Sequence, residues 1–195
     1  MDLPTRAVLV TVVPPGADRE ALLAAVARVA AVDVDAVRAG RECPHCGSTG
    51  HGRPWATAAG AAVAVSTARC PGQVAVAVVS GPGRTDDRLG IDLEQVARVA
   101  AASLDAFGPR ERRRLRDDRD RTAAWAVKEA VLKRDGRGLR VDPRAVEVDL
   151  RRSVARLEGR EEPVTVVWTA SGTVLAVASG GLPVVVEDRV SASAS

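Results

Sequence analysis

The chain of 195 residues is 46% hydrophobic and 27% charged, a balance typical of a soluble globular protein with one domain or two small ones. Its formal charge of +3 is too small to indicate nucleic acid, and no apolar run approaches the roughly 20 residues that cross a bilayer. We therefore expect no nucleic-acid partner and no membrane span. Three cysteines, an odd number, argue against a disulfide framework and favour a cytoplasmic location.

The first half of the chain is expected to hold a buried strand, a helix, a loop, a β-hairpin and a linker, at residues 7–13, 18–32, 40–55, 61–79 and 81–83. The valine-rich start lacks a small-residue cleavage site, which is typical of a strand and not of a signal peptide. Asp18 is the expected N-cap of the helix, because its side chain can accept a hydrogen bond from the first turn.

The second half repeats this order with a strand, helical segments and three further strands, at residues 88–94, 94–107, 120–134, 146–150, 164–170 and 173–178. The pair of strands over 164–178 resembles the hairpin over 61–79 in pattern and in its place within its half. We therefore expect two α/β halves related by a weak duplication, at 1–83 and 84–188. Residues 189–195, rich in serine and alanine, are expected to be a disordered tail.

Only two of the 28 lysine and arginine residues are lysines, Lys128 and Lys133, and both lie in W-A-V-K-E-A-V-L-K, residues 125–133. Tyrosine and asparagine are absent, which indicates a GC-rich coding sequence. Residues that persist against this bias, including Ile91 and Phe107, are hypothesised to occupy positions where chemistry tolerates no substitute. Chance clustering is the alternative.

On a helix, the residues of this stretch that fall on one face are Trp125, Lys128, Glu129, Leu132 and Lys133. A face that mixes an indole, a carboxylate and two ammonium groups is unusual for packing alone. The simpler interpretation is an amphipathic helix in which Glu129 pairs with Lys133 at i+4, worth roughly 0.3–0.5 kcal/mol.

The segment G-I-D-L-E, residues 90–94, changes this balance. Asp92 and Glu94 are two residues apart, so they share one face of a strand, and they repel each other unless a cation or a proton lies between them. If Glu129 lies beside them, three carboxylates suit Mg²⁺, and the two lysines suit phosphate oxygens. Such a site favours phosphoryl-type transfer.

Together, G-I-D-L-E and W-A-V-K-E-A-V-L-K resemble the paired signature of the Sfp-type 4′-phosphopantetheinyl transferases, G-[IV]-D-x-E followed by [FW]-x-x-K-E-[AS]-x-x-K. Between them, D-A-F-G-P-R-E-R-R-R-L resembles the family's Phe and Glu before an arginine-rich helix. Upstream, residues 41–54 resemble R-x-C-x-x-C-G-x-x-H-G-[KR]-P of actinobacterial members. The resemblance covers most of the chain, from about residue 41 to the final hairpin.

The resemblance implies a pseudo-twofold pair of similar α/β (α+β) subdomains, a monomer, with coenzyme A and Mg²⁺ bound between the halves. The implied reaction transfers the 4′-phosphopantetheine arm of coenzyme A to a serine of an acyl or peptidyl carrier domain and releases adenosine 3′,5′-bisphosphate. By family analogy, carriers of polyketide or peptide synthetases are expected rather than a dedicated fatty-acid carrier.

By the same resemblance, Asp92, Glu94 and Glu129 would hold the metal on the pyrophosphate. Glu129 would help to deprotonate the attacking serine, and Lys133 and Lys128 would stabilise charge on the diphosphate and the leaving group. The expected catalytic residues are thus Glu129, Lys133 and Asp92. The expected coenzyme A contacts are Arg41, Arg53, Ser66, Thr67, Lys128 and Lys133.

The chain departs from the family's pattern at the end of the first hairpin strand, where many members have Ser-His and the His contacts the 3′-phosphate of coenzyme A. Here Ser66 is followed by Thr67. A hydroxyl donates one hydrogen bond but carries no charge, so we expect weaker coenzyme A binding and intact chemistry. Arg69 is a candidate to compensate.

Cys43, His45, Cys46 and His51 have part of a zinc-binding pattern, although no second ligand pair follows at a standard spacing. Within the resemblance, these residues shape the loop that leads to Arg53.

Two further hypotheses stay open. A degenerate relative would bind coenzyme A or a carrier domain without turnover, a reading that the threonine at position 67 motivates. A different Mg²⁺-dependent phosphotransferase would use a nucleotide, but the chain lacks a G-x-x-x-x-G-K-[ST] loop.

Overall fold

The structure is a computed structural model that describes residues 6–81, 87–169 and 172–192. It confirms the mixed α/β class, and the chain divides into two compact units. Among the described residues, unit 1 comprises 6–67, 72–81, 87–89 and 182–192, and unit 2 comprises 68–71, 90–169 and 172–181.

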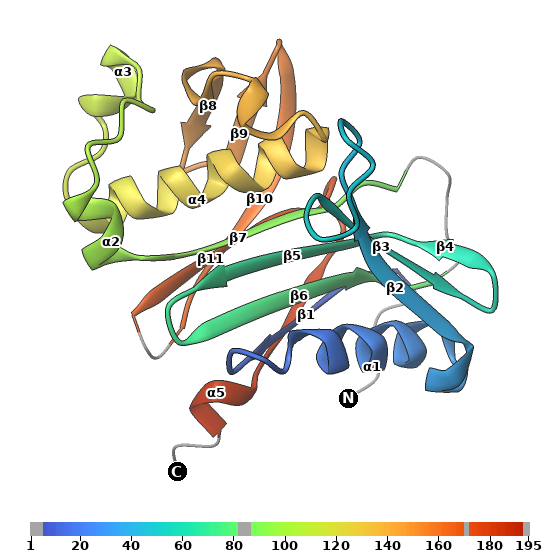
Figure 1. The fold of residues 1–195 in the computed structure, drawn as a ribbon. Helices are drawn as coiled ribbons and strands as arrows, with labels where there is room; N and C mark the ends of the chain where they lie inside the picture. The colour runs from blue at the N-terminus through green and yellow to red at the C-terminus, as the bar shows by residue number, and fades with distance from the viewer. Residues whose placement is uncertain (1–5, 82–86, 170–171, 193–195) are drawn as a thin grey trace. The chain divides into compact units, whose positions relative to one another are not determined.

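The described part of unit 1 contains two sheets, the long helix α1 and the short helix α5 (Figure 1). Its elements are β1 (Val8–Val13), α1 (Asp18–Ala30), η1 (Val34–Ala36), β2 (Val37–Glu42), β3 (Arg53–Ala58), β4 (Ala61–Val63), β5 (Val65–Cys70), β6 (Gln73–Val79), β12 (Val184–Asp188) and α5 (Arg189–Ala192). The last residues of β5, 68–70, are assigned to unit 2. The larger sheet has the order β12-β1-β6-β5, and the smaller sheet has the order β2-β3-β4.

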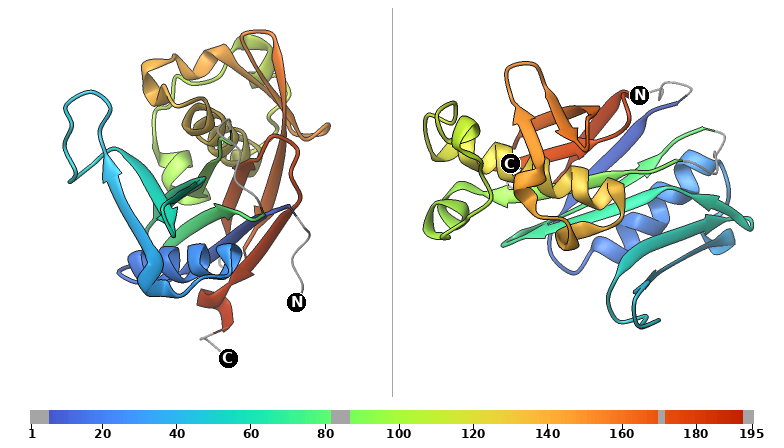
Figure 2. Two further views of the ribbon diagram at one scale, coloured as in Figure 1. Left: turned by 90° about the vertical axis from the view of Figure 1, so that its right-hand side faces the viewer. Right: turned by 90° about the horizontal axis from the view of Figure 1, so that it is seen from above.

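Helix α1 packs against strands of both sheets of unit 1 (Figure 2). Leu22 and Val26 of the helix join Leu9 and Val76 of the larger sheet in one hydrophobic core. The residue before the helix is Ala17, and no side chain caps it, so the predicted N-cap at Asp18 is wrong by one position. A carboxylate in the first turn still favours the helix, because the N-terminal end of the helix dipole is positive.

Unit 2 is a five-stranded sheet covered by a long helix (Figure 1). Its elements are β7 (Gly90–Gln95), α2 (Val96–Ala101), α3 (Pro109–Arg112), α4 (Asp118–Asp135), η2 (Gly138–Arg140), η3 (Pro143–Ala145), β8 (Val146–Asp149), β9 (Val154–Leu157), β10 (Arg160–Trp168) and β11 (Thr173–Ala178). The sheet order is β7-β11-β10-β9-β8, and α4 packs on β7 and β11.

The helix expected over residues 94–107 is much shorter in the structure, because α2 ends at Ala101. The following segment is irregular and brings Ala106 and Phe107 into the core of unit 2, where both side chains are buried. Burial of one aromatic ring therefore outweighs continuation of the helix at this point.

The two units share a topology. In each unit, the first strand pairs antiparallel with the second strand of a hairpin, β1 with β6 and β7 with β11. In each unit, a helix that follows the first strand, α1 or α4, packs on that sheet. This common order agrees with the predicted duplication. The pseudo-twofold relation between the units stays a prediction.

The division of the chain differs from the predicted halves at 1–83 and 84–188. Strand β12 belongs to unit 1, because it pairs parallel with β1, and residues 87–89 also belong to that unit. Residues 189–192, expected in a disordered tail, form α5, and 193–195 lie outside the described residues. Part of the predicted linker, 82–83, also lies outside them.

Candidate metal and phosphate site

Strand β7 approaches helix α4 closely because its first residue is Gly90. A Cβ atom at this position would lie 1.9 Å from the carbonyl oxygen of Ala130 and 2.5 Å from the amide nitrogen of Arg134, both on α4. Side chains alternate along a strand, so Asp92 and Glu94 share the face of Gly90 and are directed at the helix. The glycine thus allows two carboxylates to lie beneath α4.

Asp92 is held by Lys133. The Nζ atom of Lys133 donates to Oδ1 of Asp92 at 2.6 Å and to the carbonyl oxygen of Ile91 at 3.1 Å. The second oxygen of Asp92, Oδ2, is buried and has no hydrogen-bond partner among the described residues. Burial raises the pKa of Asp92, and the nearby Lys133 ammonium lowers it in part. This oxygen is thus an acceptor that a further donor or a cation could satisfy.

Glu94 and Glu129 complete a cluster of three carboxylates. The indole Nε1 of Trp125 donates to Oε1 of Glu94 at 3.2 Å. Helix α4 therefore orients Glu94 as well as Asp92. Burial raises the pKa of Glu129, and the charges of Asp92 and Glu94 raise it further. The pKa of Glu94 is raised by burial and by Asp92. The three groups therefore repel one another across the strand–helix interface.

This donor set fits a hard divalent cation. Carboxylate oxygens are the ligands that Mg²⁺ prefers, and a cation would relieve both the mutual repulsion and the unpartnered oxygen of Asp92. In the structure, the carboxylates are less tightly gathered than metal ligands: among the described residues, only a cysteine–histidine group has all its ligand atoms within 4.8 Å of one another. An ion would have to draw the three side chains together.

The environment of Lys128 differs from the predicted one. Its side chain is 0% exposed, whereas that of Lys133 is 32% exposed. The ammonium donates to Oε2 of Glu111 at 3.0 Å, to the carbonyl oxygen of Pro143 at 3.0 Å and to the carbonyl oxygen of Val146. All three of its protons are engaged, so the predicted contact of Lys128 with coenzyme A is corrected to an internal role.

The correction follows from helix geometry. Successive residues on an α-helix are turned by about 100°, so Lys128 and Glu129 cannot point the same way. Trp125, Glu129 and Lys133 follow each other at intervals of four residues and lie along the β7 side. The face proposed from the sequence was therefore too wide, because it included a neighbour of the central glutamate.

Glu111 is the residue whose structural role the sequence analysis did not assign. Its carboxylate is buried and accepts hydrogen bonds from Lys128, from the amide of Gly108 at 3.1 Å and from the amide of Val148 at 3.0 Å. One side chain thus joins α3, α4 and β8. Its position four residues after Phe107, in the segment compared with the family's Phe and Glu, was the available signal.

The expected coenzyme A contacts of the first half all lie in unit 1. Arg41, on β2, donates to Oγ1 of Thr67 at 2.9 Å and to the carbonyl oxygen of Gly52 at 3.3 Å. Ser66 is buried on β5, and Arg53 is exposed at the start of β3. The structure therefore places a guanidinium, Arg41, at the hydroxyl that replaces the expected histidine. Whether these residues face the carboxylates stays a prediction.

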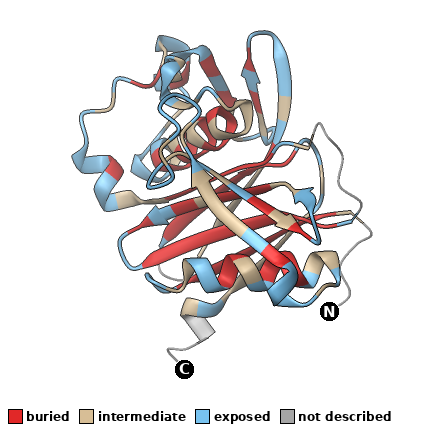
Figure 3. Ribbon diagram, turned by 45° about the vertical axis from the view of Figure 1, so that its right-hand side comes forward, coloured by how far each residue is buried: buried red, intermediate tan, exposed pale blue. Residues whose placement is uncertain are grey.

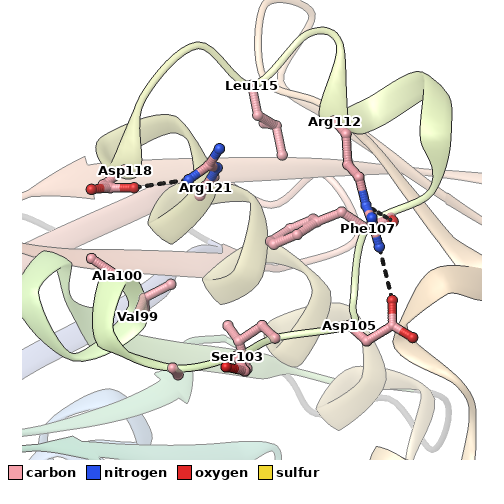
Figure 4. Close-up of a pocket in the computed structure, with 11 residues that line it drawn as sticks. Val99, Ala100, Ser103, Asp105, Phe107, Arg112, Leu115, Asp118 and Arg121 are labelled. Carbon is pink, nitrogen blue, oxygen red and sulfur yellow. Dashed lines mark hydrogen bonds and ion pairs between the residues drawn. The ribbon is translucent and has the colours of Figure 1, made fainter.

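Unit 2 also has a pocket of about 480 Å³ beside α2 and α3 (Figure 4). Its apolar part includes Leu104, Phe107 and Leu115, and its charged part includes Arg112 and Arg121. Both arginines are paired with nearby aspartates at 2.8 and 3.1 Å. None of the three carboxylates at the β7–α4 contact lines this pocket.

In unit 1, the loop between β2 and β3 gathers two cysteines and a histidine. The backbone amides of Cys46 and His45 are the main causes that lower the pKa of the Cys43 thiol to about 7. The distance between Sγ of Cys46 and Nε2 of His51 is 3.5 Å.

Comparison with known proteins agrees with the site. The model of the 4′-phosphopantetheinyl transferase superfamily matches residues 88–178, a segment that contains β7, α4 and all three carboxylates. The match supports phosphopantetheine transfer in general, and the mixed α/β architecture is consistent with that fold family. It does not separate the Sfp type from other branches. A search of curated proteins gave no match. Among the described residues, none of the helices is long and apolar enough to cross a membrane.

Proposed function

We propose that the protein transfers the 4′-phosphopantetheine arm of coenzyme A to a serine hydroxyl of an acyl or peptidyl carrier domain, with Mg²⁺ bound by Asp92, Glu94 and Glu129. The observation that carries this proposal is the meeting of β7 and α4. There, three partly or fully buried carboxylates and one ammonium, that of Lys133, converge within a segment that matches the superfamily.

The residues have separate tasks in this reaction. Mg²⁺ bound at the carboxylates would neutralise charge on the diphosphate of coenzyme A. Glu129 takes the proton of the attacking serine, directly or through one water molecule. At the same time, the Oγ atom of that serine bonds to the phosphorus that bears the pantetheine arm. The bond from that phosphorus to the bridging oxygen breaks, and adenosine 3′,5′-bisphosphate leaves. Lys133, with its partly exposed ammonium, stabilises the charge on the leaving phosphate.

Lys128 has a different task in this proposal. Through its contacts with Glu111 and the carbonyl groups before and at the start of β8, it fixes α4 in place. It is thus a positioning residue for Glu129, one position further along the helix.

In unit 1, cationic side chains are proposed to bind the phosphates of coenzyme A. Arg53 is exposed and lines a pocket of about 230 Å³. Arg41 supports Thr67, and Ser66 lies next to it on the strand. Because a neutral hydroxyl replaces an imidazole at position 67, we propose that the affinity for the 3′-phosphate is modest and depends on Arg41.

We further propose a monomer in the cytoplasm that acts on polyketide or peptide synthetase carriers. All three cysteines are free thiols in the structure, which supports a reducing compartment. The choice of carrier follows from family resemblance alone.

The test is a transfer assay. The purified protein is incubated with coenzyme A, MgCl₂ and apo carrier domains of the polyketide, peptide and fatty-acid types, and each carrier is analysed by mass spectrometry. We expect the mass of the phosphopantetheine arm to appear on the carrier serine, and EDTA to prevent this. Binding of coenzyme A without modification of any carrier would overturn the proposal in favour of a non-catalytic relative. Hydrolysis of a nucleotide instead would favour another phosphotransferase.

A further inference from the structure

We propose that the loop between β2 and β3 is a zinc site, in which Cys43, Cys46 and His51 bind one Zn²⁺ ion and a water molecule occupies the fourth position. One sulfur or nitrogen atom from each of the three side chains lies within 4.8 Å of the others. Within the described parts of the chain, no other set of three His, Cys, Asp or Glu residues meets this condition. The three residues belong to unit 1, whereas the three carboxylates belong to unit 2.

The distances fit tetrahedral zinc. Zinc–sulfur bonds of about 2.3 Å and zinc–nitrogen bonds of about 2.0–2.1 Å place a sulfur and a nitrogen ligand about 3.5 Å apart. The Sγ atom of Cys46 and the Nε2 atom of His51 are 3.5 Å apart. One edge of the tetrahedron is therefore already formed, and the sulfur of Cys43 needs a shift of about 1 Å or less to complete the face.

The loop backbone is shaped to hold these side chains. The amide of Cys43 donates to the carbonyl oxygen of Ser48, and the amide of Gly47 donates to the carbonyl oxygen of Cys43, each at 2.9 Å. Gly47 has a φ of 68°, which a left-handed turn requires. These two hydrogen bonds bring both cysteines to one side of the turn, in the way that short Cys-x-x-Cys turns present two thiolates to one ion.

Gly52 returns the histidine to the same place. Its φ is 107°, and a Cβ atom there would lie 2.3 Å from the carbonyl oxygen of Glu42. Only glycine allows the two ends of the loop to meet this closely. His51, the residue before it, is thereby placed opposite Cys46 although the chain between them is exposed.

A metal would also explain how this loop keeps its form. Pro44 and residues 45–47 are exposed, and the loop has no buried hydrophobic residue of its own. A segment without a core is commonly ordered by a disulfide or a metal ion. A bound ion would fix the end of the β2–β3 hairpin, next to the carbonyl oxygen of Gly52 that accepts from Arg41. On the function proposed above, it would hold two arginines of the coenzyme A contact, Arg41 and Arg53, in register.

The first test measures metal content. The full chain, purified with a phosphine reductant and without chelators, is analysed by inductively coupled plasma mass spectrometry, and we expect about one zinc ion per chain. The variants Cys46→Ser and His51→Ala should lose the ion. The matched controls Cys70→Ser, a buried cysteine on β5, and His45→Ala, a histidine of the same loop outside the group, should keep it.

The second test examines the ligands. Replacement of zinc by Co²⁺ should give the thiolate charge-transfer and tetrahedral d–d absorption bands, and both should disappear in Cys46→Ser. Circular dichroism should show the same secondary structure for all variants, because the loop lies outside the sheets and helices. A metal-free chain that gives no cobalt spectrum would overturn the proposal. A Cys43–Cys46 disulfide under reductant, or equal zinc loss in His45→Ala, would also overturn it.

The outcome can be separated from that of the transferase proposal. Glu129→Gln should bind zinc as the unmodified chain does, even though it should not transfer the phosphopantetheine arm. A zinc-binding protein without transferase activity would contradict only the proposed function, and an active protein without zinc would contradict only the metal site.

Discussion

The first strand and the main helix of each unit occupy the same place in a common topology but carry different chemistry. In unit 1, β1 has the sequence V-L-V-T-V-V, all six residues are buried, and α1 meets this sheet with alanine, leucine and valine (Figure 3). In unit 2, β7 has the sequence G-I-D-L-E-Q, and α4 meets it with an indole, a glutamate and a lysine.

The contact of β1 and its sheet with α1 stabilises unit 1 by removing apolar surface from water, at about 25 cal/mol per Å². The contact of β7 with α4 costs stability at its charged positions, because burial disfavours the ionised carboxylates and raises the pKa values of Asp92, Glu94 and Glu129. Unit 1 demonstrates that the topology can be built without these charges. Carboxylates with raised pKa values, at positions where aliphatic residues serve in unit 1, indicate a functional site rather than a stabilising contact.

The largest expected effect comes from removing the carboxylate of Glu129 at the contact between β7 and α4. Glu129→Gln keeps the shape of the side chain but removes the carboxylate that we propose as the base and as one metal ligand, so transfer should fall by about 10²–10⁴-fold. The rate is followed by mass spectrometry of a carrier domain. Glu20→Gln on α1, the corresponding helix of unit 1, is the control and should retain full activity. Comparable rates for the Glu129 variant and the unmodified chain would remove the glutamate from the mechanism.

The second prediction tests the internal face of α4. Lys128→Met leaves the carboxylate of Glu111 buried without its cation, and loss of one partner of a buried pair costs about 3–5 kcal/mol of unfolding free energy. The measurement is urea denaturation. The double variant Lys128→Met/Glu111→Gln should recover part of the loss, because the buried charge is gone while an oxygen remains for the amide of Val148. Additive losses would contradict the coupling.

The third prediction tests the close approach of β7 to α4 at Gly90, a feature that β1 lacks because it begins with a valine. Gly90→Ala places a methyl group 1.9 Å from a carbonyl oxygen of α4, so the strand and the helix must separate, at a cost of about 1–3 kcal/mol. Strand β1 begins with a valine at its corresponding end. As a control, Gly50→Ala meets only a serine hydroxyl at 3.7 Å and should change the stability little. Equal thermal stabilities for the two variants would argue against the contact.

The smallest expected effect concerns pH and metal. The raised pKa values of Asp92, Glu94 and Glu129 mean that the folded, metal-free chain holds more protons than the unfolded chain above about pH 4, the ordinary carboxyl range. Their contribution to the unfolding free energy therefore falls as the pH rises from that value through the raised pKa values. Asp92→Asn/Glu129→Gln should show a weaker fall, and Mg²⁺ should stabilise only the unmodified chain. Denaturation across pH, with and without MgCl₂, measures both.

Local patterns predicted most of the elements. The strand at 7–13 and the helix at 120–134 are confirmed with shifts of a few residues, because their hydrophobic spacing is strong within each segment. The hairpin at 61–79 is confirmed in part: its expected first strand divides into β4, which pairs with β3 in the smaller sheet, and β5, which lies beside β6 in the larger sheet. The pair of Asp92 and Glu94 on one strand face also followed from spacing. The predicted loop at 40–55 was too long, since β2 and β3 occupy its ends.

Other features depend on partners distant in sequence. Strand β12 pairs with β1, although the two strands lie near opposite ends of the sequence. Nothing in V-V-V-E-D indicates that partner. The burial of Lys128 depends on Glu111 and on carbonyl groups after residue 142, so a helical wheel could not separate it from Lys133. The convergence of His51 with Cys46 depends on the left-handed glycine that follows it.

The parallel pairing of β12 with β1 has a consequence for synthesis. The edge strand of the larger sheet of unit 1 leaves the ribosome only after every residue of unit 2. All strands of unit 2 therefore precede β12 in the chain, so unit 2 does not need the last strand to complete its own sheet. A purified chain truncated after residue 181 should contain a protease-resistant second unit and an incomplete first one.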